Sequence, residues 1–585
     1  MKTEWEFPWA KPEEFLEERK KIEKAHDEFV LKWKNRKDYL ENPETLLLAL
    51  EDYEELIRYY SGGGREGYYY WLNQGLNQLN MDLRKNYLQV EEFSNKQSNK
   101  LLFFDISIGK IPVEKQKEFL EKESLKKYRE FLKKIFENSK HILSEAEEKI
   151  LSLKESGSYG LWVKMVESLL SKETFMIEGK EKTFEELITL TKSKDKDLRM
   201  LAKEGFEKIL EKYEEIAEVE LNAVLENAKV NDELRGFTKP DEARINTDSI
   251  DYEFINSLLD SVKENFSISH KYYSILAKLI GQEKIDYSER GVEVGEIAKE
   301  YEYNEAINLV KDVFSNLDKT FLELFEEMLA SGKIDAFPKK GKMGGAFCVH
   351  FGLYDPVYIL LNFTKDLHDV STIAHEMGHA INFTFSKEKE NSLNFGIPEA
   401  TGEVASIFME DFVFKKILSE STEEEKFYLL FKKIGEDISS IFRQIALYLF
   451  ELEIHNIYRK EGYLSKEKIG EIFVKHMSSY MGEDVTMEKA NLWWIYWSHI
   501  RMYFYVYSYA SGTLISKTIQ AKYREDNSFI EKIKIFLETG KSKSPREIFR
   551  EMGIEIDKEF FTKGILEIKK NLDEVEELGK KLGKL

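Results

Sequence analysis

The stretch STIAHEMGHAIN, residues 371–382, governs the interpretation of the whole chain because it contains the pattern HExxH. On a helix, residues four apart share a face, so His375 and His379 can direct their imidazoles at one metal ion. Glu376 lies about 100° around the helix, off the metal but within reach of a metal-bound water. Two histidines leave room for a third protein ligand and an open position, as in catalytic zinc sites. The alternative interpretation is a structural pair of histidines in a polar pocket.

Two glutamates downstream compete for the third ligand position. Glu399 lies 20 residues after His379, the spacing of thermolysin-type zinc peptidases, and Glu403 lies 24 residues after it. Glycines and a proline make residues 396–402 a poor helix, whereas the run EVASIFMEDFVFKKIL, which begins at Glu403, has helical periodicity. A ligand on a rigid helix is better positioned than one on a loop, but spacing alone leaves both candidates open.

Composition restricts the class of protein. The chain has 585 residues, of which 42% are hydrophobic, enough for a sizeable core. Its net charge of −21 argues against nucleic acid and against an anionic membrane as partners. The single cysteine, Cys348, excludes an internal disulfide and fits a reducing compartment. Because we find no signal-peptide pattern and no run of 18 apolar residues, we expect a cytoplasmic protein.

Helical periodicity dominates the chain, with apolar residues three and four apart over 11–35, 117–155 and 197–230. The strand signal is local: FCVHFGLY (347–354) and DPVYILLNF (355–363) predict a short hairpin or ribbon just before the HExxH helix. We therefore expect a mainly α protein with a small β-ribbon or sheet beside the motif. The expected domains are an N-terminal helical domain over 1–190 and a catalytic domain over 191–585.

The chain resembles the oligoendopeptidase F family, which are zinc metallopeptidases related to thimet oligopeptidase. The resemblance covers residues 340–555 most closely and extends more weakly toward residue 120. One departure is Asn382, where many members of the family have a histidine three residues after the second histidine of the motif. The segments that carry the resemblance are GGAFC (344–348), ILLNFTKDLHDVSTIAHEMGHA (359–380), EVAS (403–406), HIRMYFYVYSYASG (499–512) and FLETGKSKSPREIFREMGI (536–554).

This resemblance implies a zincin-type helical body that encloses a deep substrate channel and holds one Zn²⁺ per chain. It selects Glu403 over Glu399 as the partner of His375 and His379. Glu376 is the expected general base, which takes a proton from the water and passes it to the leaving amine. Glu410 lies two helical turns after Glu403 and is expected to orient a ligand histidine.

Catalysis also needs hydrogen-bond donors for the developing oxyanion. His499 is the first candidate, and Tyr505, Tyr507 and Tyr509 follow it, with Tyr507 preferred. The alternative interpretation is that these tyrosines belong to the core.

Substrate binding is expected at two places before the motif. The run DPVYILLNF, which includes Leu361 and Asn362, can act as an edge strand that pairs with an extended peptide. Gly344 and Gly345 let a backbone approach closely, or they merely turn a hairpin.

The sequence therefore predicts a zinc-dependent oligoendopeptidase that hydrolyses internal bonds of short, unfolded peptides. One alternative is a zinc metallocarboxypeptidase of related fold. Another is a peptide-binding protein without catalytic activity whose metal is structural, but such a site needs no glutamate like Glu376 beside its ligands. Short peptides are the expected partners, and the sequence predicts neither the oligomeric state nor the cleavage specificity.

Overall fold

The computed structural model describes residues 1–60, 63–295 and 299–585. Most of these residues are helical, and the described strands form small sheets of two or three strands. The prediction of a mainly α fold with a small sheet beside the HExxH helix is confirmed. Among the described helices, none combines the length and the hydropathy that a membrane crossing requires.

Contacts along the chain define two compact units. Unit 1 comprises Met1–Glu145, Lys299–Ile417 and Lys522–Ile554, and unit 2 comprises Ala146–Ala298, Leu418–Ala521 and Glu555–Leu585. Both units contain segments from before and after residue 190. The expected division into two consecutive domains, 1–190 and 191–585, stays a prediction.

Unit 1 buries an aromatic core between its first helices, where Phe29 and Trp33 of α1 meet Tyr53 of α2 and Phe104 of α4. The periodicity expected over 11–35 is realised in α1. The helices of this unit are α1 (Phe15–Trp33), α2 (Pro43–Tyr60), α3 (Gly64–Leu76), α4 (Met81–Gly109), α5 (Val113–Glu121), α6 (Arg129–Asn138), α14 (Tyr303–Leu317), α15 (Lys319–Ser331), α16 (Leu367–Lys389), most of α17 (Val404–Glu420), α22 (Ile530–Glu538) and α23 (Pro545–Glu551).

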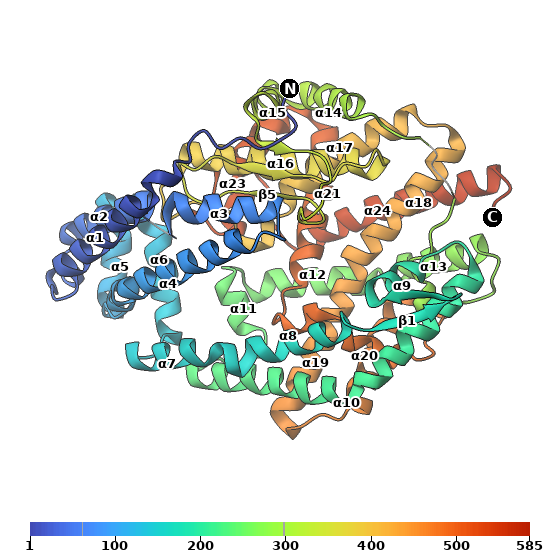
Figure 1. The fold of residues 1–585 in the computed structure, drawn as a ribbon, viewed down its shortest axis with the longest axis horizontal. Coiled ribbons are helices and arrows are strands. Elements are labelled where there is room, and N and C mark those ends of the chain that lie inside the picture. Colours follow the sequence, from blue (N-terminus) through green and yellow to red (C-terminus); the bar gives the residue numbers. More distant parts are fainter. Residues whose placement is uncertain (61–62, 296–298) are drawn as a thin grey trace. The chain divides into compact units, whose positions relative to one another are not determined.

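The sheet of unit 1 has the strand order β4-β6-β5, formed by β4 (Ile334–Asp335), β5 (Phe347–Val349) and β6 (Tyr358–Leu360). β6 is parallel to β4 and antiparallel to β5, so the hairpin expected before the HExxH helix is present. The expectation that the segment containing β6 forms an edge strand is wrong, because β6 has a neighbour on both sides. The edge on this side is β5, and α16 packs against β5 and β6 (Figure 1).

The start of α16 is fixed by its own sequence. Asp366 caps the helix by accepting the backbone N–H of His368 at 2.7 Å. Asp369 reaches back to accept the N–H groups of Thr364 (2.7 Å) and Asp366 (3.0 Å). This reciprocal capping joins the helix to the turn after β6 and sets where the HExxH residues fall along it.

Unit 2 is built around the 40-residue helix α10, which packs against α8, α9 and α19. Its sheets are the antiparallel pair β1 (Thr174–Ile177) and β2 (Lys180–Thr183) and the parallel pair β3 (Ile285–Asp286) and β7 (Val485–Thr486). Its helices are α7 (Glu145–Glu155), α8 (Leu161–Leu170), α9 (Phe184–Leu190), α10 (Lys196–Arg235), α11 (Glu242–Thr247), α12 (Tyr252–Glu264), α13 (Phe266–Leu279), α18 (Glu423–Ser440), α19 (Phe442–Glu461), α20 (Lys466–Met481), most of α21 (Tyr507–Glu525) and α24 (Lys558–Lys581).

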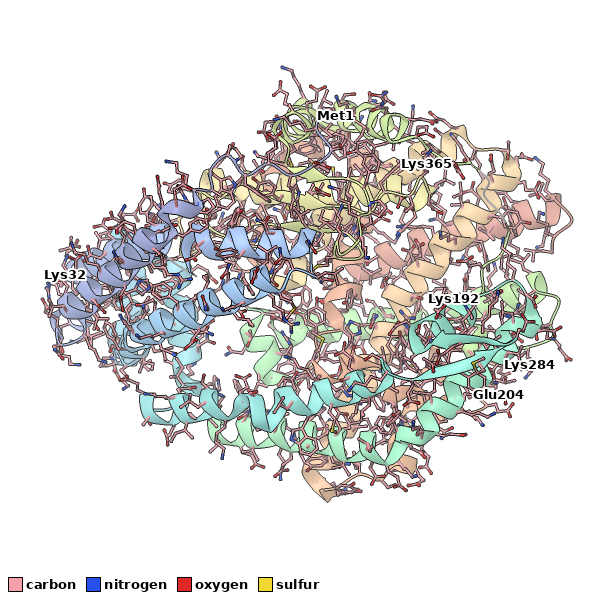
Figure 2. All side chains as sticks on the ribbon, in the orientation of Figure 1. Met1, Lys32, Lys192, Glu204, Lys284 and Lys365 are labelled. Carbon is pink, nitrogen blue, oxygen red and sulfur yellow. The ribbon has the colours of Figure 1, made fainter. Side chains whose placement is uncertain are left out.

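Many of the lysines and glutamates lie on the outer faces of these helices and in the turns between elements. Figure 2 labels several of them, Lys32, Lys192, Glu204, Lys284 and Lys365, and all five are exposed. Pairs four residues apart, such as Lys208 with Glu204, add helix-surface ion pairs of small individual value.

Candidate metal centre and active site

His375, His379 and Glu403 form the candidate metal centre of unit 1. Each offers one ligand atom, and these atoms all lie within 4.8 Å of one another. The Oε2 atom of Glu403 lies 3.3 Å from Nε2 of His375 and 3.5 Å from Nε2 of His379. Two imidazole nitrogens and one carboxylate oxygen are a ligand set that suits zinc and leaves a coordination position open. Within the described part of the chain, Glu399 is not a member of this group.

Gly378, inside the HEMGH motif, explains how Glu403 reaches the two histidines. A Cβ atom at this position would lie 2.6 Å from the carbonyl oxygen of Ala405 and 2.6 Å from the Cα atom of Ser406. Only glycine lets the backbones of α16 and α17 approach this closely. The contact places the residue just before α17, Glu403, opposite His375 and His379.

A second carboxylate orients His375. Its Nδ1 atom lies 3.0 Å from Oε2 of Glu410, which leaves Nε2 directed at Glu403. Such a partner fixes the tautomer and the ring orientation of a metal-binding histidine. Glu403 is itself held by the hydroxyl of Ser406, which donates a 2.9 Å hydrogen bond to its Oε2 atom.

These contacts control the charges of the centre. Burial lowers the pKa of His375, but its hydrogen bonds to Glu403 and Glu410 outweigh burial and raise the pKa to about 10. Burial raises the pKa of Glu403, but the hydrogen bonds from His375 and His379 prevail and hold it well below its usual range. Because a metal ligand must be deprotonated, binding of a cation by this centre releases protons.

Glu376 occupies the place expected of a general base. Its side chain is buried, with 6% of its surface exposed, and burial raises its pKa, while the nearby His375 and His379 act in the opposite direction. The backbone N–H of Cys348 in β5 donates a hydrogen bond to its carboxylate. A carboxylate whose pKa is shifted toward neutrality is suited to accept and return a proton.

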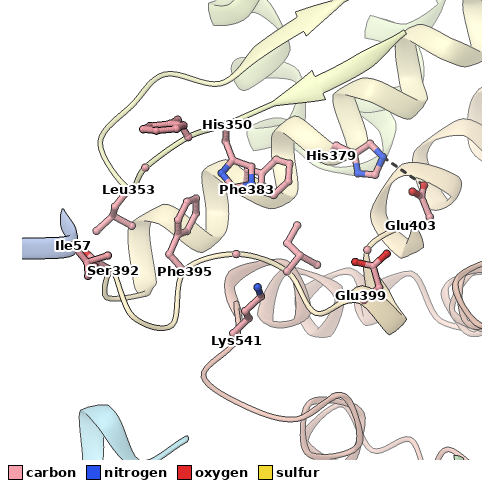
Figure 3. A pocket seen from close by; sticks show the side chains of 15 residues that line it. Ile57, His350, Leu353, His379, Phe383, Ser392, Phe395, Glu399, Glu403 and Lys541 are labelled. Carbon is pink, nitrogen blue, oxygen red and sulfur yellow. Dashed lines mark ion pairs between the residues drawn. The ribbon is translucent and has the colours of Figure 1, made fainter. Parts of the chain in front are cut away.

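A cavity of about 430 Å³ adjoins the metal ligands. Figure 3 shows Lys541 and Glu399 directed toward the same space as His379 and Glu403. On another wall, the ring of His350 packs against Phe383, with 3.8 Å between ring centroids, and burial lowers the pKa of His350 to about 4. The residues that line the cavity are Ile57, His350, Phe351, Gly352, Leu353, His379, Phe383, Ser392, Phe395, Gly396, Ile397, Glu399, Gly402, Glu403 and Lys541.

Of the four residues expected to bind substrate, Gly344 and Gly345 lie in the turn before β5, and Leu361 and Asn362 directly follow β6. The side-chain amide of Asn362 donates to the carbonyl oxygens of Met343 (2.9 Å) and Gly345 (2.7 Å), so it holds this turn. Leu361 is buried, and its N–H donates to the carbonyl oxygen of Asp335 at 2.8 Å. At both Gly344 and Gly345 a Cβ atom would meet open space. A substrate role for Gly344, Gly345, Leu361 and Asn362 stays a prediction.

The histidine and tyrosines expected to act as oxyanion donors belong to unit 2. The hydroxyl of Tyr509 lies 3.3 Å from Nε2 of His499, and the ring of Tyr505 meets that of Tyr509 edge-on at 5.5 Å. Tyr507, the tyrosine preferred from the sequence, is fully buried and donates its hydroxyl proton to Asp248 at 2.7 Å. The roles of all four residues stay predictions, and this geometry favours Tyr505 and Tyr509 over Tyr507.

Two family profiles match the chain. Residues 189–564 match "Peptidase family M3", and residues 108–175 match "Oligopeptidase F". The chain belongs to peptidase family M3. This M3 chain is therefore a zinc metallopeptidase of the oligopeptidase type, and its relationship to the oligoendopeptidase F family, expected from the sequence motifs, is confirmed.

Relatives of this M3 peptidase match it over nearly its whole length. It is 26% identical to an "Oligoendopeptidase F homolog" of Borreliella burgdorferi, over 99% of this chain and 98% of the relative. A protein of known structure from Chlamydophila abortus superposes with a TM-score of 0.84 at 23% identity, covering 98% of each chain. Oligoendopeptidase F from Enterococcus faecium superposes with a TM-score of 0.72 at 18% identity, covering 97% of this chain and 99% of that structure.

Some features of this M3 site are not apparent from the sequence. Lys541 lines the cavity beside the metal ligands although it lies far from them along the chain. Cys348 touches the general base through its backbone amide, which no side-chain pattern indicates. The glycine of HEMGH was the one local signal that could have indicated a close helix approach, since only glycine lacks the Cβ that would block it.

Proposed function

We propose that this M3 peptidase hydrolyses internal bonds of short, unfolded peptides with one Zn²⁺ per chain. One observation carries the proposal: His375, His379 and Glu403 converge on a single point, while Glu376 stands beside them outside the ligand group. A structural zinc site would use four protein ligands and would not need a buried carboxylate beside them. The same observation supports zinc as the metal.

In the proposed reaction, the chain's own groups orient the substrate and move the proton. Bound Zn²⁺ would supply Lewis acidity toward the attacking water and the scissile carbonyl. Glu376 accepts the proton of the water and passes it to the leaving amine. The edge strand β5 offers backbone groups to an extended peptide. His499, with Tyr505 or Tyr509, donates hydrogen bonds to the carbonyl oxygen as negative charge develops on it.

Mass spectrometry of products tests this proposal directly. Peptides of about five to twenty residues, the reach of a channel at roughly 3.3 Å per extended residue, are acetylated at the N-terminus and amidated at the C-terminus. Internal cuts that disappear with a chelator and return with zinc are the expected result. Stepwise removal of C-terminal residues from unblocked peptides, with no internal cuts, would instead identify a carboxypeptidase.

We further propose that the substrates are unfolded and that the protein acts in the cytoplasm, where its lone cysteine remains reduced. A flexible casein-like chain and a stable folded protein, incubated with the peptidase under the same conditions, test substrate selection. We expect the casein-like chain to be cut and the folded protein to persist, because a folded chain offers no extended segment without local unfolding. Rapid degradation of the folded protein would contradict this. Fractionation of the source cells tests the location.

A further inference from the structure

The turn that joins His499 to the tyrosines of unit 2 has an unusual backbone. Tyr503 has φ = 49° and Phe504 has φ = 63°, so two consecutive residues that are not glycine lie in the left-handed region. Side chains disfavour this conformation, and it persists only where surrounding groups hold it. The turn lies between the short 3₁₀ helix Ser498–Arg501, which carries His499, and α21.

A buried carboxyl group holds the second of these residues. Glu451 of α19 accepts the backbone N–H of Phe504 at 3.0 Å, and both residues are completely buried. Within the described part of the chain, the other oxygen of Glu451 has no hydrogen-bond partner. Burying a carboxyl group with one partner is unfavourable compared with an apolar side chain of the same size. Two interactions favour a glutamate at this position: the hydrogen bond from Phe504 and the charge of Arg244.

An arginine holds the first residue from another helix. Arg244 of α11 donates from Nε to the carbonyl oxygen of Tyr503 (3.0 Å) and from Nη2 to that of Met502 (2.9 Å). Its Nη1 atom lies 3.6 Å from Asp248, which also accepts the hydroxyl proton of Tyr507 in the first turn of α21. The guanidinium thus connects the carbonyl groups of the turn to the start of the helix that carries Tyr509.

We propose that Arg244 and Glu451 are positioning residues, which hold the Tyr503–Phe504 turn so that Tyr509 stays beside His499, and Tyr505 beside Tyr509, in a catalytically competent arrangement. This inference rests on the proposed function, in which His499 and these tyrosines stabilise charge on the substrate carbonyl oxygen. Arg244 and Glu451 act through the backbone of the turn. Burial raises the pKa of Glu451 to about 8, although the N–H of Phe504 and the charge of Arg244 act in the opposite direction, and either protonation state can accept the N–H of Phe504.

A matched pair of substitutions at Glu451 tests the inference. Glu451→Gln keeps an oxygen that can accept the N–H of Phe504, whereas Glu451→Met keeps the length of the side chain but removes the acceptor. We expect Glu451→Met to lower kcat roughly tenfold to hundredfold, less than the roughly 10²- to 10³-fold cost of losing an oxyanion donor outright, with KM and zinc content nearly unchanged. Glu451→Gln should keep most of the activity. Equal activity of the two variants, whether high or low, would overturn the inference.

Two further measurements separate positioning from a loss of folding. The affinity for a phosphinic peptide, which imitates the tetrahedral transition state, should fall in Glu451→Met in parallel with kcat/KM, because the lost interactions belong to the transition state. In a His499→Ala background, Glu451→Met should cause little additional loss, since both changes remove the same function. Independent, multiplicative losses would contradict a role that acts through His499 and its tyrosines.

The controls distinguish failure of the inference from failure of the proposed function. Full activity of His499→Ala would refute the proposed role of the whole cluster. A large loss in His499→Ala with full activity in Glu451→Met would refute the clamp alone. If Glu451→Met does not fold, Arg244→Lys carries the test, because a lysine cannot bridge both carbonyl oxygens as the guanidinium fork does. Its kcat should fall while KM is retained, and unchanged kcat would overturn the inference.

Discussion

The Nδ1 atom of His375 lies 3.0 Å from the Oε2 atom of Glu410, while the Nε2 atom of the same ring faces Glu403. We predict that Glu410→Ala weakens zinc binding roughly tenfold to hundredfold, because the ring loses the partner that fixes its tautomer. Competition with a chromogenic chelator measures the affinity. Glu410→Ala with the affinity of the parent chain would show that the neighbouring helices alone orient His375.

The choice between the two glutamates after the motif predicts a clear difference in metal content. Glu403→Ala should lose most of its zinc, since Glu403 supplies the third ligand atom of the centre. Glu399→Ala should keep its zinc, because Glu399 lines the adjoining cavity instead. Metal analysis of both purified variants provides the comparison, and the reverse pattern would support the thermolysin-like spacing.

If Glu376 is the general base, its replacement should give a variant that binds zinc but has a low kcat. Glu376→Gln should keep the metal and lose about 10² to 10⁴ in kcat, the usual contribution of general base catalysis. The amide retains the shape of the carboxylate and can still accept the N–H of Cys348, so the loss is chemical and not structural. Near-normal turnover in a fully metallated variant would exclude Glu376 as the base.

The contact between α16 and α17 predicts that one added methyl group weakens the centre. In Gly378→Ala the new Cβ would meet backbone atoms at 2.6 Å, and overpacking of this kind costs about 1–3 kcal/mol. We expect a lower unfolding temperature together with weaker zinc binding. Gly344→Ala is the control, because its Cβ would meet open space. Equal effects of the two substitutions would rule out the helix contact as the cause.

We predict that Asp105, which is not part of the metal centre, makes the stability of the protein depend on pH. Burial raises the pKa of Asp105 in α4 from 3.8 to about 6, and its buried Oδ1 atom has no hydrogen-bond partner among the residues that the structure describes. The pKa of Asp105 is higher in the folded protein than its ordinary value of 3.8. The neutral carboxyl group therefore gives its full contribution to the free energy of unfolding below pH 3.8, and this contribution is lost as the pH rises through 6. Removing the carboxylate should therefore stabilise the protein under neutral and alkaline conditions, by up to roughly 3 kcal/mol.

Unfolding temperatures of Asp105→Asn and the parent chain at acid and alkaline pH test this prediction. The advantage of the variant should grow as the pH rises through about 6. Asp82→Asn, which alters an exposed carboxyl group of the same helix, should show no such trend. An advantage of Asp105→Asn that stays constant with pH would contradict the assignment.

Local periodicity was sufficient for the parts of the site that lie on one helix. The spacing of His375 and His379 places both on one face of α16, and Glu376 follows from the same geometry. Glu403 needed the family resemblance, because the intervening chain can place either glutamate near the histidines. Its position depends on helix packing at Gly378, which involves residues of a second element.

The sequence could not predict which strand forms the edge of the sheet or which tyrosine is buried. β6 lies in the middle of the sheet because β4 pairs with the edge of β6 that does not face β5. β4 has only two residues, too few to show a strand pattern in the sequence. Tyr507 differs from Tyr509 because Asp248, from a distant part of the sequence, accepts its proton. Both outcomes are set by partners remote in sequence, which one-dimensional patterns do not specify.

The backbone contact at Gly378 also bears on how the enzyme acquires its metal. The close packing of α16 against α17 sets the spacing of the three ligands through protein atoms. We therefore expect zinc to be removed and restored without unfolding of these two helices. The active fraction of the enzyme would then follow the supply of the ion.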